Sequence, residues 1–288
     1  MRPIALALAL LVAVPVLTAQ TPPPPAKRLP PAGVAIPEAA RKELTAATET
    51  LRKDIDALAT ELAAPGKTRW ATMLPDVEVY HKAVDWSLRY DEFFDVKHVE
   101  VAKRLLKTGH ERAAQLREGK APWTEATGTV IRGYRSKLDN SIQPYALTLP
   151  PDWKRTGQPP RRLDVVLLGR GEKRTELGFI VERERPAREN DIVPEGGIVL
   201  TPYGRFCNAT KFAGEVDVFE ALQAVRRACR VDESRIVVRG FSMGGASTWH
   251  LATHFPEVWA AASPGAGFAE TAVYAKVFAA NKPERTPW

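Results

Sequence analysis

The residues with the clearest chemical potential form the segment Gly-Phe-Ser-Met-Gly-Gly at positions 240–245, directly after a β-branched run. A serine on a sharp turn from a strand into a helix presents its hydroxyl above the sheet, where it can attack a carbonyl carbon. Side chains at Gly240 and Gly244 would crowd the strand and helix that meet there, and Gly245 completes the glycines of the turn. The sequence therefore predicts that Ser242 is a nucleophile.

The helix expected after Ser242 adds a second chemical element. Its first N–H groups lack partners within the helix, and its dipole places partial positive charge at the N-terminus. Both features favour the negative charge that develops on a carbonyl oxygen under attack. The backbone N–H of Met243 is therefore predicted to be one donor of an oxyanion hole.

Two periodicities describe the elements that must position this turn. Apolar residues recur at helical spacing in the first part of the chain, where we expect helices at 38–64, 76–94 and 97–117, with a core cluster of Trp86, Tyr90, Phe93 and Phe94. Later segments alternate between strand-like and helix-like patterns. Strands are expected at 128–135, 143–149, 163–168, 197–201, 235–241 and 258–262, and helices near 176–183, 215–230 and 243–254. This alternation predicts an α/β fold with a doubly wound, mostly parallel sheet that opens with an antiparallel pair.

Residues 129–267 resemble the α/β-hydrolase superfamily, in particular its secreted esterase and prolyl-oligopeptidase-like (S9-type) branch. The serine turn is the specific motif. Supporting matches are Asp139-x-Ser141-x-Gln143-Pro144-Tyr145, Val165 to Gly171, Asp232-x-x-Arg235-Ile236 and Phe255-Pro256. The resemblance divides the chain into a helical region at 38–120 and a partial α/β-hydrolase domain at 128–288.

The resemblance also implies the other parts of a catalytic site. A second oxyanion donor would come from the loop after the third strand, here the backbone N–H of Arg170 or of Gly171. The family usually has His-Gly at the start of that loop, whereas this chain has Leu168-Gly169. The triad acid and histidine would follow a seventh and an eighth strand, for which the residues after the sixth leave no room. The sequence is therefore expected to be C-terminally truncated.

The five histidines of the chain are the other candidates for a general base. His250 and His254 would lie roughly 12 and 18 Å beyond Ser242 along the helix axis, too far to reach its hydroxyl. A helical cap could bring one of the others over the site, namely His81, His98 or His110. Asp217 and Glu220 are expected to be structural or solvent-facing. No group of His, Cys or Asp residues shows metal-ligand spacing, and no cofactor is implied.

Composition bears on the partners of the protein. The formal net charge is +7, but acidic residues are interspersed with the basic ones throughout. No basic stripe is combined with stacking aromatic residues, which favours a solvated surface over a nucleic-acid interface. The expected partner is a small ester or peptide substrate, and the sequence does not indicate an oligomeric state.

The N-terminus has the pattern of a secretory signal peptide at 1–19. Arg2 supplies the positive charge, an apolar run follows at 4–17, and Ala19 is a small residue at a plausible cleavage point. A proline-rich stretch at 20–37 is typical of an extended linker. The sequence thus predicts export to the periplasm or the extracellular space, without stable membrane insertion after cleavage. An uncleaved membrane anchor is the alternative.

Two questions stay open at the level of sequence. Cys207 and Cys229 could form a disulfide in an exported protein, or they could be two buried thiols. The resemblance implies a serine hydrolase that acts on ester or peptide bonds through Ser242. The alternative is a hydrolase-fold remnant or binding module that lacks the triad acid and histidine.

Overall fold

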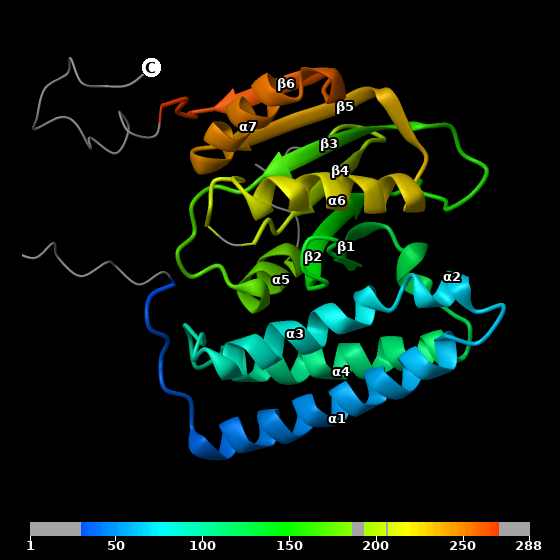
Figure 1. The fold of residues 1–288 in the computed structure, drawn as a ribbon, viewed down its shortest axis with the longest axis vertical. Coiled ribbons are helices and arrows are strands. Elements are labelled where there is room, and N and C mark those ends of the chain that lie inside the picture. Colours follow the sequence, from blue (N-terminus) through cyan, green and yellow to red (C-terminus); the bar gives the residue numbers. More distant parts are fainter. Residues whose placement is uncertain (1–29, 186–192, 206, 271–288) are drawn as a thin grey trace, which may run out of the picture.

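The computed structural model describes residues 30–185, 193–205 and 207–270. The predicted signal peptide and most of the proline-rich linker lie outside these residues. Within the described part, none of the helices combines the length and the apolar composition needed to cross a membrane. Helices and a six-stranded sheet account for most of the described chain (Figure 1).

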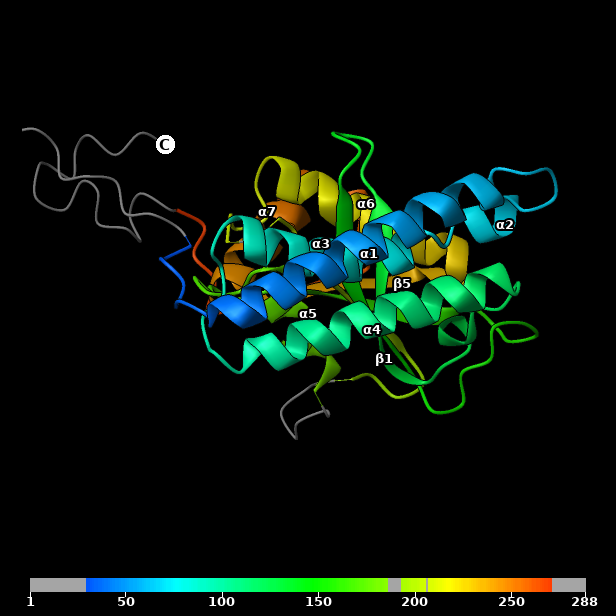
Figure 2. The same cartoon turned by 90° about the horizontal axis from the view of Figure 1, so that it is seen from below.

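The first part of the chain is helical. It contains α1 (Glu38–Leu62), the short α2 (Thr68–Ala71), α3 (Pro75–Arg89) and α4 (His98–Arg117), followed by the 3₁₀ turn η1 (Pro122–Thr124). The apolar stripe of α1 is buried, as its spacing predicts: Leu44, Leu51, Ile55, Leu58 and Leu62. Seen from below, α1, α3 and α4 run side by side as a layer (Figure 2).

The sheet is mixed, with the order β1-β2-β4-β3-β5-β6. Its strands are β1 (Gly128–Arg135), β2 (Ile142–Leu149), β3 (Arg161–Leu167), β4 (Ile198–Pro202), β5 (Val231–Phe241) and β6 (Ala261–Gly265). β1 pairs antiparallel with β2, and β2 pairs antiparallel with β4. β4, β3, β5 and β6 are parallel to one another. The predicted sheet, mostly parallel and opened by an antiparallel pair, is therefore confirmed.

The last strand begins three residues later than the sequence predicts. Pro256 opens the 3₁₀ turn η2 (Pro256–Val258), so Val258 is not part of a strand. Trp259 is buried, and its Nε1 donates a hydrogen bond to the carbonyl of Leu251, 3.1 Å away. Pairing with β5 therefore starts only at Ala261, opposite Val237. The apolar pattern at 258–259 reflects packing against a helix rather than membership of the sheet.

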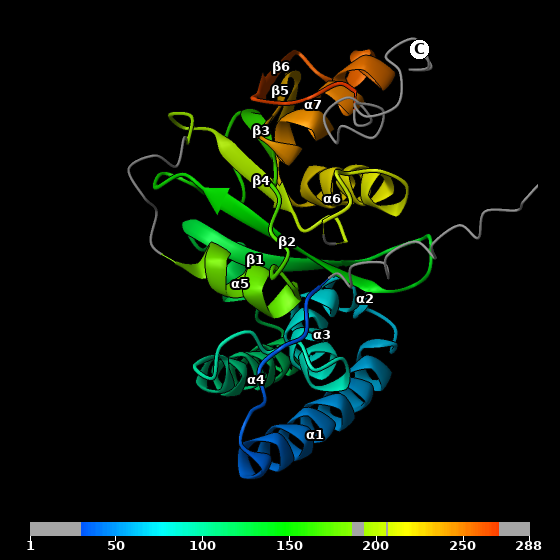
Figure 3. The same cartoon turned by 90° about the vertical axis from the view of Figure 1, so that its left-hand side faces the viewer.

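Three helices connect the parallel strands: α5 (Glu176–Glu184), α6 (Ala213–Ala228) and α7 (Met243–His254). One face of the sheet packs against α6 and α7, and its core includes Val165, Leu200, Val238 and Leu222. The opposite face packs against α5 and the helical layer through a second core. Figure 3 shows this arrangement, with α6 and α7 on one side of the sheet and α1, α3 and α4 beyond the β1–β2 end.

Charged groups are buried where α3 meets the sheet. Asp76 accepts hydrogen bonds from Arg132 Nε at 2.8 Å, from the Gly133 N–H at 2.8 Å and from Trp123 Nε1 at 2.9 Å. Lys82 Nζ lies 2.5 Å from Glu176 Oε1, which joins α3 to α5. Each of these buried charges has a partner of opposite charge, because an unpaired charge is costly to remove from water.

The predicted aromatic core cluster is only partly correct. Phe93 is buried, but Trp86 and Tyr90 are exposed and contact each other edge to face. The ammonium group of Lys82 lies 4.1 Å from the centre of the Trp86 ring, so this ring covers a charge instead of filling the core.

Candidate active site at the β5–α7 turn

Ser242 occupies the turn between β5 and α7 in a backbone conformation that non-glycine residues rarely adopt. Its φ is 58° and its ψ is −120°. Its N–H donates to the Gly265 carbonyl at 2.9 Å, and its own carbonyl accepts from the Ala246 N–H at 3.0 Å. These bonds hold a conformation that costs on the order of 1–3 kcal/mol. Such strain fixes the turn from which the serine side chain projects.

The glycines of the turn are required by close backbone packing. A Cβ on Gly240 would lie 2.4 Å from the Gly244 carbonyl oxygen, and a Cβ on Gly244 would lie 2.2 Å from the oxygen of Leu167. A Cβ on Gly245 would lie 2.3 Å from the Gly265 oxygen. The first turn of α7 thus rests directly on the backbone of β3, β5 and β6, with no side chain between them.

The two residues predicted to supply oxyanion donors lie in the first turn of α7 and in the loop after β3. Met243 is the first residue of α7, so its N–H belongs to the first turn, where N–H groups have no acceptor within the helix. The loop after β3 also runs close to the turn, because a Cβ on Gly169 would lie 3.3 Å from the Phe241 carbonyl oxygen. Arg170 follows in that loop, and its guanidinium lies 2.5 Å from Glu172.

A cleft of about 790 Å³ opens beside Ser242. It runs over the sheet face that carries Val166, Val199 and Arg239, and Ser263 of β6 also lines it. Leu168, Gly169, Arg170, Gly240, Phe241 and Ser242 line the part of the cleft at the β5–α7 turn. The structure therefore brings Ser242 and Arg170 to one cavity.

The structure brings no histidine into this cleft among the residues it describes. His110 Nδ1 lies 3.1 Å from Asp54, which ties α4 to α1. His81 and His98 lie on α3 and α4, and burial lowers the pKa of both. The general base expected for Ser242 is thus not found among the described histidines.

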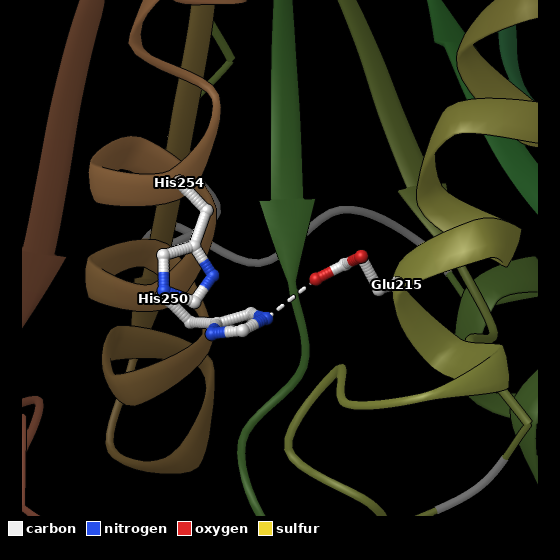
Figure 4. A group of neighbouring side chains, drawn as sticks. All are labelled: Glu215, His250 and His254. Carbon is white, nitrogen blue, oxygen red and sulfur yellow. Dashed lines mark hydrogen bonds and ion pairs between the residues drawn. The ribbon is translucent and has the colours of Figure 1, made fainter.

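His250 and His254 do have a partner that their positions in the sequence do not indicate. His250 Nε2 lies 2.6 Å from Glu215 Oε2 on α6, and the His254 ring packs against His250 with ring centres 4.3 Å apart (Figure 4). The ligand atoms of all three residues lie within 4.8 Å of one another. The four-residue spacing of the histidines on a helix was the available signal. The third member comes from another helix, which spacing alone does not indicate.

Two acidic residues on α6, before β5, have structural partners. Asp217 is buried and ion-paired with Arg205, with Nε and Oδ2 2.9 Å apart. Burial raises the pKa of Asp217, and Arg205 partly offsets this effect. Glu220 accepts a hydrogen bond from the N–H of Lys137 at 2.8 Å. Neither residue lines the cleft at Ser242.

Both cysteines are free thiols in the structure. Cys207 Sγ lies 3.8 Å from Met243 Sδ, at the base of the turn. Cys229 is buried at the far end of α6, and burial raises the pKa of its thiol to about 11.

A mostly parallel sheet with this strand order, carrying a serine on the turn from β5 into the following helix, defines the α/β-hydrolase class of fold. Residues 209–287 match the model of the prolyl oligopeptidase family. This match covers α6, β5, the serine turn and β6, and it confirms the resemblance seen in the sequence. It supports a serine hydrolase at the level of the family.

Comparison with curated proteins finds no match. Among solved structures, a thermostable esterase is similar with 23% identity and a TM-score of 0.36, over 50% of this chain and 43% of that one. The S-formylglutathione hydrolase of Staphylococcus aureus shows 19% identity and a TM-score of 0.37, over 51% and 59%. Prolyl oligopeptidase B of Galerina marginata shows 16% identity and a TM-score of 0.38, over 51% and 22%. This chain spans less than two thirds of each, and likenesses this distant do not indicate an activity.

Proposed function

We propose that the protein is a serine hydrolase in which Ser242 attacks the carbonyl carbon of an ester or peptide bond. In this reaction the Ser242 Oγ forms a bond to the carbonyl carbon and loses its proton to a base. The carbonyl oxygen becomes an oxyanion, held by the N–H groups of Met243 and Arg170. Collapse of the intermediate expels the alcohol or amine and leaves an acyl-enzyme, which water hydrolyses.

The observation that carries this proposal is a serine in a strained turn that packed backbone holds beside a cleft. A φ of 58° at a serine is maintained here by close packing of the glycines of β5, β6 and α7 and of the Leu167 backbone on β3. Strain of this kind is concentrated at functional sites, where surrounding structure over-determines the conformation. The position at the N-terminus of α7 adds a field that favours an oxyanion.

A non-catalytic binding module is the second candidate. Leu168 lies where the related enzymes have a histidine, and no described histidine lines the cleft. A serine without a base would retain little turnover, since loss of a hydrolase nucleophile or base lowers kcat by roughly 10⁶-fold. The two candidates therefore differ by a large factor in a reaction that requires an activated serine.

Fluorophosphonate labelling of the purified protein distinguishes the two candidates. A base-activated Ser242 forms a covalent adduct, and Ser242→Ala lowers labelling to background. Ser263→Ala is the matched control, because Ser263 lines the same cleft but lies on β6 outside the strained turn. This variant is expected to label like the unmodified protein.

Absence of labelling from a protein with a cooperative unfolding transition would overturn the hydrolase proposal and favour the binding module. Labelling that persists in Ser242→Ala would assign the nucleophile to another residue. Where labelling is confirmed, turnover of a p-nitrophenyl acyl ester and of a chromogenic peptide amide separates esterase from peptidase activity.

A further inference from the structure

We propose that Glu215, His250 and His254 form a binding site for a divalent transition-metal ion of the Zn²⁺ type. The three side chains come from two neighbouring helices, α6 and α7, and point toward one another (Figure 4). Two imidazoles and one carboxylate are a common ligand set for such ions, which leave a fourth position to water or another ligand. The site spans α6 and α7, and α7 is the helix that begins next to Ser242.

The helix sets the first half of the site. Residues four apart on an α-helix lie on the same face, one turn above the other. His250 and His254 therefore project together from α7, and their rings meet edge to face. Two histidines in this relation can chelate one ion without any change in the backbone.

Glu215 supplies the third ligand of the proposed site. It lies in the first turn of α6, with its Oε2 2.6 Å from Nε2 of His250. Two ligands of a tetrahedral zinc ion are separated by roughly 3.3 Å when each lies about 2 Å from the metal. The carboxylate and imidazole are thus already close to the separation that coordination requires, and side-chain rotation supplies the rest.

A bound metal would take the place of the hydrogen bond between Glu215 and His250. A proton between Nε2 and Oε2 holds the two groups together in the metal-free protein. Coordination through Nε2 displaces that proton to Nδ1 of the same ring or to solvent, because imidazole ligates through a free nitrogen lone pair. The metal then links the same two atoms and adds His254, which the hydrogen-bonded pair does not use.

The surroundings permit an ion to enter. The side chains of His250 and Glu215 are 17% and 29% exposed, and His254 is exposed. The second nitrogen of a ligating histidine normally needs a partner or water, which this exposure provides. A bound ion would link α6 to α7 and so restrict the motion of α7, the helix that begins at the Ser242 turn.

Cobalt and zinc binding by the purified, chelator-treated protein tests the proposal. Co²⁺ is expected to give visible d–d absorption bands at one equivalent, and Zn²⁺ should abolish them by displacement. Zn²⁺ should also raise the Tm in a concentration-dependent way, since an ion that binds only the folded state stabilises it. These readouts use no substrate, so they do not depend on hydrolase activity.

His254→Gln is the decisive variant, because it removes one ligand from an exposed position and keeps the Glu215–His250 pair. It is expected to weaken Co²⁺ affinity by at least about tenfold. Loss of a group that only hydrogen-bonds to a metal ligand already costs about that much, and His254 would be a ligand itself. His110→Gln is the matched control: it makes the same change at a histidine paired with one carboxylate, Asp54, and should bind like the unmodified protein.

The proposal is overturned if the unmodified protein binds neither ion, or if His254→Gln binds both as tightly as the unmodified protein. Either result would leave Glu215 and His250 as a hydrogen-bonded pair that joins two helices. Equal weakening in His254→Gln and His110→Gln would also overturn it, because binding would then be spread over surface histidines.

Discussion

At the junctions that lead into α7 and α6, the residues that precede the helix have almost the same backbone conformation, although α7 follows a strand directly and α6 follows a loop. Ser242 precedes α7 with φ 58° and ψ −120°, and Phe212 precedes α6 with φ 55° and ψ −123°. A glycine follows each of them two residues later, at Gly244 and Gly214. The side chain of Phe212 is nevertheless exposed and chemically inert. The backbone conformation of a nucleophile turn is therefore not sufficient to define a nucleophile.

The two junctions differ in what holds them. Backbone packed on backbone holds the Ser242 junction, with Gly244 seated against the carbonyl of Leu167. Side-chain charges hold the loop before Phe212: Arg205 pairs with Asp139 and Asp217. Because packed backbone has less freedom to move than long side chains, we expect the Ser242 junction to be the more rigid of the two.

The largest expected effect comes from adding one methyl group at each junction. Gly244→Ala would place a Cβ 2.2 Å from a backbone oxygen, whereas the nearest atoms to a Cβ on Gly214 belong to the side chain of Asn208, at 2.6 Å. Ala gains about 1 kcal/mol of helix propensity at both positions. Gly244→Ala is expected to lower the free energy of unfolding by about 3 kcal/mol or more, and Gly214→Ala by less than about 1 kcal/mol.

Urea unfolding of both variants measures this difference. Equal destabilisation would show that the Ser242 junction is no more rigid than the Phe212 junction.

The next largest effect is expected from removing the charge of Arg205, in the loop before Phe212. Arg205→Met leaves the fully buried Asp217 carboxylate without its cation. Removing one partner of a buried pair costs about 3 kcal/mol, with some reduction here because Arg205 is partly exposed. Arg226→Met is the control, since its pair with Glu233 is at the surface and worth about 0.5 kcal/mol.

A double variant, Arg205→Met with Asp217→Asn, should recover part of the stability lost in Arg205→Met. No recovery in thermal or urea unfolding would mean that Arg205 acts through packing rather than charge.

Glycine substitution separates strain from chemistry. Ser242→Gly and Phe212→Gly each relieve a positive φ, so each is expected to raise the free energy of unfolding by about 1 kcal/mol, after the entropy that glycine adds to the unfolded chain. Fluorophosphonate labelling should be lost in Ser242→Gly and kept in Phe212→Gly. Destabilisation by both substitutions would show that neither junction stores strain.

The smallest expected effect is a dependence on pH. The hydrogen bond from Arg205 and that from Ser141 hold the pKa of Asp139 well below its usual range. A depressed carboxylate pKa stabilises the folded state above the unfolded pKa of about 3.9, and this contribution is lost as pH falls toward the folded pKa. Asp139→Asn should therefore cost less than about 1 kcal/mol at pH 7, because Asp139 is half exposed, and nothing at the lowest pH.

Unfolding curves at pH 7, 5 and 3 for both proteins provide the measurement. A difference that grows as the pH falls would contradict this account of Asp139.

Local patterns in the sequence were enough to predict most of the fold. The period of Leu44, Leu51 and Ile55 identifies α1, and alternation with turn residues identifies β1 with its observed bounds. The turn at Ser242 is also recognisable, because its residue types are dictated by a local backbone shape. The short α2 has too few residues to show a period, and β6 was displaced because a buried Trp259 resembles a strand residue.

What could not be predicted depends on contacts between distant segments. Glu215 and His250 are 35 residues apart, and only the packing of α6 on α7 brings them together. Asp76 and Arg132 meet across 56 residues for the same reason. The catalytic roles of Met243 and Arg170 stay predictions, since they concern a reaction rather than a shape.

The acceptor role of Asp76 has a consequence for how the protein could be divided. One carboxylate on α3 satisfies Arg132, the Gly133 N–H and Trp123, so the outer strand of the sheet relies on a helix from the other region of the chain. Gly133 also allows β1 to lie against the Pro75 carbonyl. In a fragment that starts at Gly128, Arg132 and the Gly133 N–H would lose the Asp76 carboxylate as their acceptor. The helical layer and the sheet are therefore one unit for expression, domain grafting and circular permutation, and a cut between them removes part of the support of the first strand.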